Sequence, residues 1–125
     1  MDVELTPREL DIMEILWARG PSTVSEVQGA LSDELAYTTV LTMLRIMEGK
    51  GYLSRTREGR ADRYAPEVKR RAAEKSALGR VTERLFWGSP EELLIRLVET
   101  DLDADQLRRM RELLDRRIRE MEAES

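Results

Sequence analysis

The stretch that decides the fold runs from residue 37 to residue 65 and reads YTTVLTMLRIMEGKGYLSRTREGRADRYA. Its first part predicts a helix over 38–48, because apolar residues recur there at the three- and four-residue spacing of one helix face. These apolar residues are Val40, Met43, Leu44 and Met47. The second part predicts a β-hairpin, with strands at 52–57 and 61–65 joined by a turn at 58–60. The stretch therefore predicts one helix followed directly by a two-stranded hairpin.

Two further helices are predicted upstream of this stretch, over 7–18 and 24–31. Each begins with a threonine that has a glutamate three residues later, in the sequences TPRE (6–9) and TVSE (23–26). In such a capping box the hydroxyl and the carboxylate bond free backbone N–H groups at the helix start. The residues expected to face the core are Leu10, Met13, Leu16, Trp17, Val27, Ala30 and Leu31. Three helices and a hairpin in this order predict a winged-helix DNA-binding domain over residues 1–66.

The remainder of the chain, 67–125, is predicted to be helical, with helices over 67–86, 90–99 and 104–121. In the last of these helices, apolar residues recur at steps of three and four and form a stripe. The stripe consists of Leu107, Met110, Leu114, Ile118 and Met121. A lone helix would expose this stripe to water, so we expect 67–125 to be a helical dimerisation region. The predicted fold class is mainly α with a small β-hairpin wing, a winged helix-turn-helix followed by dimerisation helices.

The helix over 38–48 carries side chains suited to DNA on the face opposite its apolar stripe. Threonine offers a hydroxyl and a methyl group to a base edge, and arginine can bind guanine through two hydrogen bonds. The hairpin adds arginines, whose planar guanidinium groups match phosphate oxygens. The predicted DNA-binding residues are Tyr37, Thr38, Thr39, Leu41, Thr42, Arg45, Arg55, Arg57, Arg60 and Arg63. We expect the helix to enter the major groove and the hairpin to lie along the phosphate backbone.

The distribution of charge supports a DNA-binding segment although the whole chain is acidic. The formal net charge is −4, but residues 45–71 hold nine basic and four acidic side chains, a local charge of +5. The rest of the chain therefore carries −9. The acidic total favours an alternative hypothesis, a winged-helix module that binds other proteins without DNA. The concentration of arginine on the hairpin favours DNA.

The composition excludes several other classes of protein. There is no cysteine and no histidine, which removes thiolate metal sites, disulfides and the commonest catalytic base. No nucleophile paired with a base and no glycine-rich phosphate loop is present, so we expect no enzyme activity, no cofactor and no metal site. No apolar run is long enough to cross a bilayer, and the N-terminus has no leader pattern. We therefore expect a cytoplasmic protein that does not insert into membranes.

Four segments resemble one known family. They are LTPREL (5–10), ILW (15–17), AYTTVLTML (36–44) and KGYL (50–53), and they are similar to motifs of the penicillinase repressor family. The resemblance covers almost the whole chain and is most specific over 36–53. It implies a winged-helix transcriptional repressor that forms a homodimer through its C-terminal helices. It also implies that the dimer binds an inverted-repeat operator in double-stranded DNA.

The resemblance further implies ways in which such a repressor is controlled. A copper-responsive branch of the family has a C-terminal cysteine motif, and the absence of cysteine here excludes copper sensing through thiolates. Several other members are inactivated when a membrane sensor protease triggers their cleavage, so a sensor-protease system is a candidate partner. The β-lactam-responsive branch is cut at an Asn-Phe bond, and the matching position here holds Arg96 and Leu97.

Overall fold

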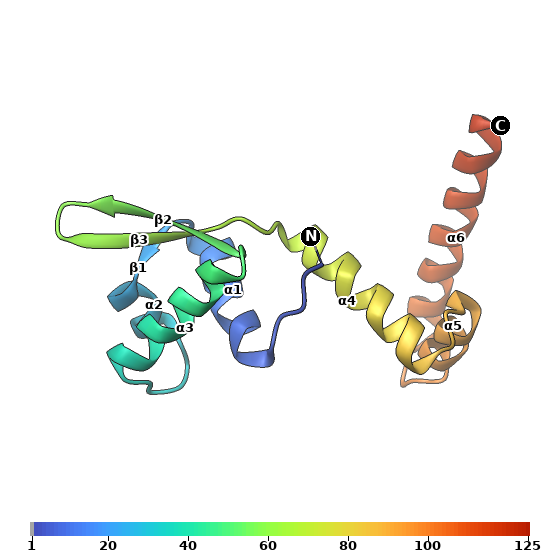
Figure 1. Cartoon of the computed structure of the whole chain (residues 1–125). Coiled ribbons are helices and arrows are strands. Elements are labelled where there is room, and N and C mark those ends of the chain that lie inside the picture. The colour runs from blue at the N-terminus through green and yellow to red at the C-terminus, as the bar shows by residue number, and fades with distance from the viewer. Residues whose placement is uncertain (1) are drawn as a thin grey trace. The chain divides into compact units, whose positions relative to one another are not determined.

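The computed structural model describes residues 2–125, which form six helices and three short strands (Figure 1). In chain order the elements are α1 (Pro7–Arg19), β1 (Ser22–Thr23), α2 (Val24–Ala30), α3 (Tyr37–Gly49), β2 (Leu53–Glu58), β3 (Ala61–Pro66), α4 (Arg70–Leu85), α5 (Pro90–Val98) and α6 (Ala104–Glu124). The chain divides into two compact units, the first ending at Arg80 and the second beginning at Val81. The division falls inside α4, so this helix contributes residues to both units.

The first unit is a winged helix built around one hydrophobic core. α1 contributes Ile12, Met13 and Leu16 to this core, and all three are fully buried. The other buried apolar residues are Val3, Val24, Val27, Val40, Leu44, Met47, Tyr52, Leu53, Tyr64 and Val68. The predicted apolar stripe of α3 is thus confirmed, with Met43 packed against the core but only partly buried. Burial of this stripe leaves the opposite face of α3 turned away from the core.

The sheet of the first unit has three antiparallel strands in the order β1–β3–β2. β2 and β3 form the predicted hairpin, in which Glu58 pairs with Ala61 across a two-residue turn. The first turn residue, Gly59, has φ 62°, a left-handed conformation that glycine adopts without strain. Figure 1 shows the hairpin extending past the helices that carry it. The sequence does not predict β1, because two residues are too few to show a strand pattern.

The helix starts follow the predicted capping chemistry. At α1, the Thr6 hydroxyl accepts a hydrogen bond from the Glu9 backbone N–H at 3.2 Å, and the Glu9 carboxylate accepts one from the Thr6 N–H at 2.9 Å. The same reciprocal pair joins Thr23 and Glu26 at α2. These bonds satisfy N–H groups that have no partner inside the helix, so both starts are fixed by local sequence.

Two residues expected in the core are exposed instead. Leu10 exposes 42% of its surface, because the buried side of α1 centres on Ile12, Met13 and Leu16. Leu10 lines a shallow apolar pocket of about 240 Å³, together with Trp17 at the far end of α1. Ala30 is exposed because it is the last residue of α2, where the helix leaves the core. The predictions for Leu10 and Ala30 are therefore wrong.

The first turns of α4 are attached to α1 in the first unit. The Trp17 indole N–H donates a hydrogen bond to the Val68 carbonyl oxygen at 2.8 Å. The Arg70 guanidinium lies 4.8 Å from the centre of the Trp17 ring and forms an ion pair with Glu14. Val68 is itself buried. The chain bends at residues 67 and 68, next to these contacts, so α4 begins at Arg70 and not at the predicted residue 67.

The second unit exposes much of its apolar surface. α6 begins with a capping box between Asp103 and Gln106, and α5 is capped by Ser89. Within the stripe expected to mediate dimerisation, Met110 is partly buried and four residues are exposed: Leu107, Leu114, Ile118 and Met121. Between α4 and α5, Trp87 exposes 82% of its surface and has a left-handed φ of 53°. The unit therefore presents apolar side chains that nothing within it covers.

Candidate nucleic-acid interface

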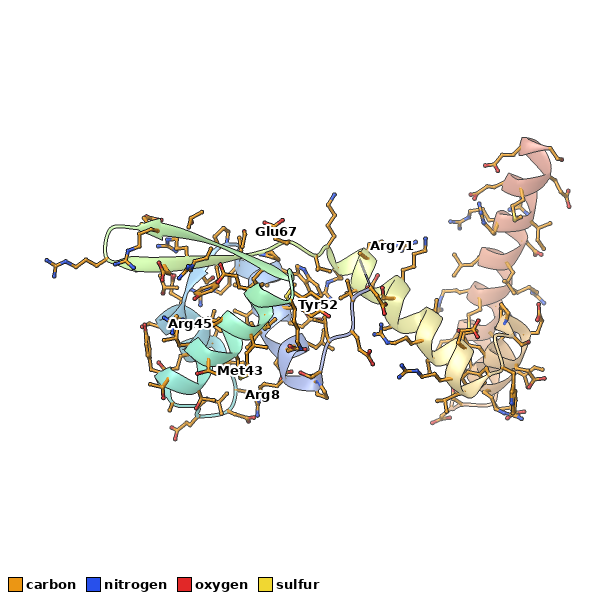
Figure 2. The ribbon with its side chains drawn as sticks, in the orientation of Figure 1. Arg8, Met43, Arg45, Tyr52, Glu67 and Arg71 are labelled. Atoms are coloured by element: carbon orange, nitrogen blue, oxygen red, sulfur yellow. The ribbon has the colours of Figure 1, made fainter. Side chains whose placement is uncertain are left out.

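The outer face of α3 presents the polar side chains that the sequence predicts for reading bases. Figure 2 labels Arg45 on α3. Five predicted residues are exposed: Tyr37, Thr38, Thr39, Thr42 and Arg45. Arg45 makes no ion pair within residues 2–125, so its guanidinium is available to an external partner. Val40, Leu44 and Met47 anchor the opposite face of the helix.

Two residues of this face are less available than the sequence suggests. Leu41 is partly buried and packs against the hydrophobic core, so only part of its side chain reaches the outer surface. The Thr42 hydroxyl donates a hydrogen bond to the Thr38 carbonyl oxygen at 2.8 Å, within the same helix. The Thr42 methyl group and the oxygen lone pairs stay free. Thr42 can therefore accept a hydrogen bond or contact a methyl group without breaking this bond.

Two hairpin arginines share one carboxylate. Asp62 on β3 lies opposite Arg57 on β2 in the strand register. Its two oxygens lie 3.3 Å from the Arg57 guanidinium and 3.5 Å from that of Arg55. Arg55 also lies 3.5 Å from the carboxylate of Glu48, near the end of α3. This chain of charges connects the last turn of α3 to the hairpin.

The other two hairpin arginines differ from each other. Arg60 is exposed in the turn and makes no ion pair within the described chain. Arg63 is held from three sides, because its guanidinium lies 3.1 Å from Glu26 and 2.7 Å from Glu58 and also donates to the Pro21 carbonyl oxygen. Its side chain ties the hairpin to the start of α2. The four arginines that sequence groups together are thus unequal in their freedom to bind phosphate.

An ion pair between a buried carboxylate and an exposed lysine fixes the end of α3 against α1. Lys50 Nζ lies 2.7 Å from the carboxylate of Glu9, which is 5% exposed. Burial alone would raise the pKa of Glu9, but hydrogen bonds from Lys50 and the Thr6 backbone and the Lys50 charge outweigh burial and lower that pKa. The hydrogen bond with Glu9 likewise raises the pKa of Lys50. Both groups therefore stay charged at neutral pH, and the pair holds α3 in place.

The ion pairs of three acidic residues, Glu9, Glu48 and Asp62, are not among the sequence-based predictions. Glu9 is visible as a helix cap, but its partner Lys50 is 41 residues away. Asp62 is detectable in principle, because a two-residue turn at Gly59 and Arg60 places it opposite Arg57. Glu48 has no such local signal. The carboxylates that accompany the arginines emerge only from the folded arrangement.

Other classes of site are not found in the described chain. Within residues 2–125, no group of three or more acidic side chains is arranged to hold a metal ion. Over the same residues, no helix has both the length and the apolar content needed to cross a bilayer.

The comparison with known families identifies the chain. The model of the penicillinase repressor family matches residues 5–116. The chain belongs to the penicillinase repressor family. This membership confirms the resemblance seen in the motifs, and the match covers the winged helix and most of the second unit.

Individual relatives of this penicillinase repressor family member agree with the fold. The transcriptional regulator BlaI of Mycobacterium tuberculosis is 46% identical over 61 residues, a match that covers 46% of this chain and 44% of that protein. The alignment thus spans less than half the length of this curated relative. A solution structure of monomeric Bacillus licheniformis BlaI with the blaP half-operator matches with a TM-score of 0.50 and 26% identity, covering 58% of this chain and 90% of that one. A MarR family protein from Bacillus stearothermophilus matches over 98% of this chain and 76% of its own, with a TM-score of 0.54 and 21% identity, which supports the fold alone.

Proposed function

We propose that this chain is a dimeric transcriptional repressor that binds an inverted-repeat operator in double-stranded DNA, in the cytoplasm. The observation that carries the proposal is the free face of α3, where Thr38, Thr42 and Arg45 project from a helix fixed by its buried side. The match to a BlaI structure with a half-operator supports it.

In this proposal α3 reads base edges in the major groove. Arg45 supplies two parallel N–H donors suited to guanine, and it has no internal partner to lose. Thr38 and Thr42 offer methyl groups and hydroxyl oxygens one turn apart on the same face. Because the Glu9–Lys50 pair and the buried stripe fix α3, these side chains meet DNA in a defined orientation.

The hairpin acts as the wing that follows the phosphate backbone. Arg60, in the hairpin turn, has no ion pair within residues 2–125 and can bind phosphate directly. Arg55 and Arg57 can bind phosphate once it replaces their carboxylate partner Asp62. Phosphate contacts supply affinity and register but little sequence preference. Arg63 belongs to the predicted set, and we assign it mainly to positioning the wing, because Glu26 and Glu58 already hold it.

Dimerisation brings two winged-helix domains, each with its own α3, to one operator. The exposed apolar stripe of α6 (Leu107, Met110, Leu114, Ile118 and Met121) provides the contact surface, in the region of residues 67–125. A two-fold symmetric dimer binds two half-sites about one helical turn apart, so the operator is an inverted repeat. Binding through two units also raises the affinity beyond that of either unit.

The test is a comparison of selected and random DNA. Duplexes that bind the purified protein are selected from a random pool, and Arg45→Ala is then titrated with the selected duplex and with random duplex. Loss of a bidentate guanine contact should cost about 1–3 kcal/mol on the selected duplex and much less on random DNA. Arg116→Ala, an exposed arginine on the face of α6 opposite the apolar stripe, is the matched control and should bind both duplexes as the parent does.

Two further outcomes keep the interpretation clear. Equal losses on both duplexes would make Arg45 a phosphate contact and overturn its role in readout. Val40→Asp serves as the reference for misfolding, because it puts an unpaired charge in the core and should abolish binding together with the folded circular dichroism spectrum. No measurable preference for any duplex, and no weakening of binding by salt, would favour the protein-interaction module instead.

A membrane sensor-protease system is the second partner that we propose. Its support is family membership alone. The position where the β-lactam-responsive branch is cut at an Asn-Phe bond holds Arg96 and Leu97 in α5 of this chain, so a related protease would have to accept a different bond. Arg96 forms an ion pair with Glu99 at 3.0 Å, and Leu97 is exposed. Mass spectrometry of the protein from cells exposed to a β-lactam tests the proposal. An intact chain under those conditions would contradict it.

A further inference from the structure

On the surface proposed to meet DNA, two acidic residues pair with the arginines of β2. The Asp62 side chain is 20% exposed, and its carboxylate accepts hydrogen bonds from the guanidinium groups of Arg55 at 3.5 Å and Arg57 at 3.3 Å. Glu48 lies 3.5 Å from Arg55 on the other side. Strand register fixes this arrangement, because Asp62 is the cross-strand neighbour of Arg57 and lies two residues from Tyr64, the neighbour of Arg55, on the same face of the hairpin. We refer to Glu48 and Asp62 as the carboxylate pair.

Among the other arginines of the same surface, Arg63 is paired with Glu26 and Glu58, whereas two arginines lack such partners. Neither Arg45 on α3 nor Arg60 in the hairpin turn makes an ion pair within the described residues. Three of the five arginines of this surface thus carry internal counter-charges and two do not. The difference does not reflect a need for stability, because exposed ion pairs at such distances stabilise a fold very little.

We propose that the carboxylate pair stands in for DNA phosphate in the free protein and limits the affinity of the wing for any DNA. Carboxylate and phosphate oxygens bind the same edge of a guanidinium group, so the two compete for Arg55 and Arg57. When DNA binds, Arg55 and Arg57 must give up their ion pairs with Asp62 to contact phosphate. The lost ion pairs reduce the net binding free energy of each phosphate contact. This inference rests on the proposed function, because it assumes that the wing contacts phosphate.

The consequence of the exchange is lower sequence-independent affinity. Phosphate contacts form on every duplex, whereas the contacts of Arg45 with base edges form on the operator. A repressor has to find its operator among a large excess of other sites, so what matters is the affinity for the operator relative to random DNA. The carboxylate pair weakens the part of binding that carries no sequence information.

The decisive variant is Asp62→Asn, which keeps the size of the side chain and removes its charge. We expect tighter binding to both random and operator duplexes, by about two- to fivefold, which corresponds to the loss of one or two exposed ion pairs. The dependence of affinity on salt should become steeper, by up to about one phosphate per subunit. Asp101→Asn, which removes the same charge from the exposed segment between α5 and α6, should change neither.

A double-variant cycle tests whether Asp62 acts through the arginines. In a background of Arg55→Ala and Arg57→Ala, the gain from Asp62→Asn should vanish, because no guanidinium remains to be released. A gain that persists there would reduce Asp62 to a general electrostatic effect and overturn the proposal. Unchanged or weaker binding by Asp62→Asn, with an unchanged thermal melting midpoint, would overturn it as well. If instead Arg57→Ala and Arg60→Ala in the parent protein leave DNA binding unaltered, the wing does not contact phosphate and this inference fails, whereas base readout by α3 is untouched. A parent protein that binds no duplex at all would overturn the proposed function itself.

Discussion

Tyr64 on β3 is fully buried, and its hydroxyl has no hydrogen-bond partner among residues 2–125. A buried polar group without a partner costs free energy on folding. Tyr64→Phe removes the hydroxyl and keeps the ring, so we expect the free energy of unfolding to stay constant or to rise by up to about 1 kcal/mol. Urea denaturation followed by circular dichroism measures this change.

Tyr52→Phe is the matched control for this prediction. The Tyr52 hydroxyl accepts a hydrogen bond from the Glu4 N–H at 3.1 Å and lies 3.3 Å from the Glu4 carbonyl oxygen, so its removal breaks contacts with the N-terminal segment. We expect a loss of about 1 kcal/mol. A loss of the same size in Tyr64→Phe would show that the Tyr64 hydroxyl is hydrogen-bonded in solution and would contradict the prediction.

Among the contacts between elements, the ion pair of Glu9 and Lys50 makes stability depend on pH. The folded protein holds the pKa of Glu9 below its ordinary value of 4.5, so the stabilisation is complete above that value. It is lost as the pH falls through the lowered pKa of the folded state. We expect Glu9→Gln to lower the free energy of unfolding by about 1–3 kcal/mol at pH 7, because glutamine keeps the helix cap but loses the charge.

The difference in the free energy of unfolding between the parent and Glu9→Gln should become smaller as the pH falls below 4.5. Thermal unfolding at a series of pH values from neutral to acid measures it. Glu34→Gln, an exposed acid in the loop before α3, provides the comparison and should not change stability by more than about 0.5 kcal/mol. A Glu9→Gln deficit that is the same at pH 7 and pH 3 would mean that packing, and not charge, is lost.

Local sequence determines the helices and the hairpin better than the contacts between them. The starts of α1 and α2 follow from the TPRE and TVSE capping boxes, which involve neighbours in sequence only. β1 cannot be predicted in this way, because a two-residue strand exists only through its pairing with Tyr64 and Arg63. Leu10, expected in the core, is exposed. Hydrophobic periodicity predicts the spacing of the buried residues of α1, but the direction in which that face points depends on contacts with other elements.

The candidate interface shows the same division. The exposed face of α3 is predictable, because burial of Val40, Leu44 and Met47 fixes which side is free. The ion pairing of the hairpin arginines is not predictable from sequence. It depends on carboxylates of α2, α3 and β3, which the fold brings next to these arginines. Patterns along the chain thus indicate which residues share a surface, but not which of their charges are already neutralised.

For the molecule as a whole, assembly through α6 is the property to test. Leu114 lies in the middle of the apolar stripe and exposes 50% of its surface, so an arginine there should prevent two copies from packing together. We expect Leu114→Arg to sediment as a monomer at micromolar concentration. It should also lose on the order of 10²-fold in affinity for a duplex with two half-sites and little for a single half-site.

Glu112→Arg is the control for this prediction, because helical spacing places it on the far side of α6 from Leu114 and it changes the charge even more. It should remain a dimer and bind both duplexes as the parent does. A parent protein that is monomeric at micromolar concentration, or a Leu114→Arg variant that stays dimeric, would contradict assembly through the α6 stripe.

The placement of the two tryptophans has a practical consequence for optical experiments. Trp17 is partly shielded in the first unit, whereas Trp87 lies almost entirely in water in the second. Their intrinsic fluorescence should therefore differ in emission wavelength and in access to a soluble quencher. Replacing Trp87 with phenylalanine leaves Trp17, on α1 next to the start of α4, as the one tryptophan. Replacing Trp17 with phenylalanine leaves Trp87, between α4 and α5. Events in each half of the chain can then be followed separately by light, without an attached dye.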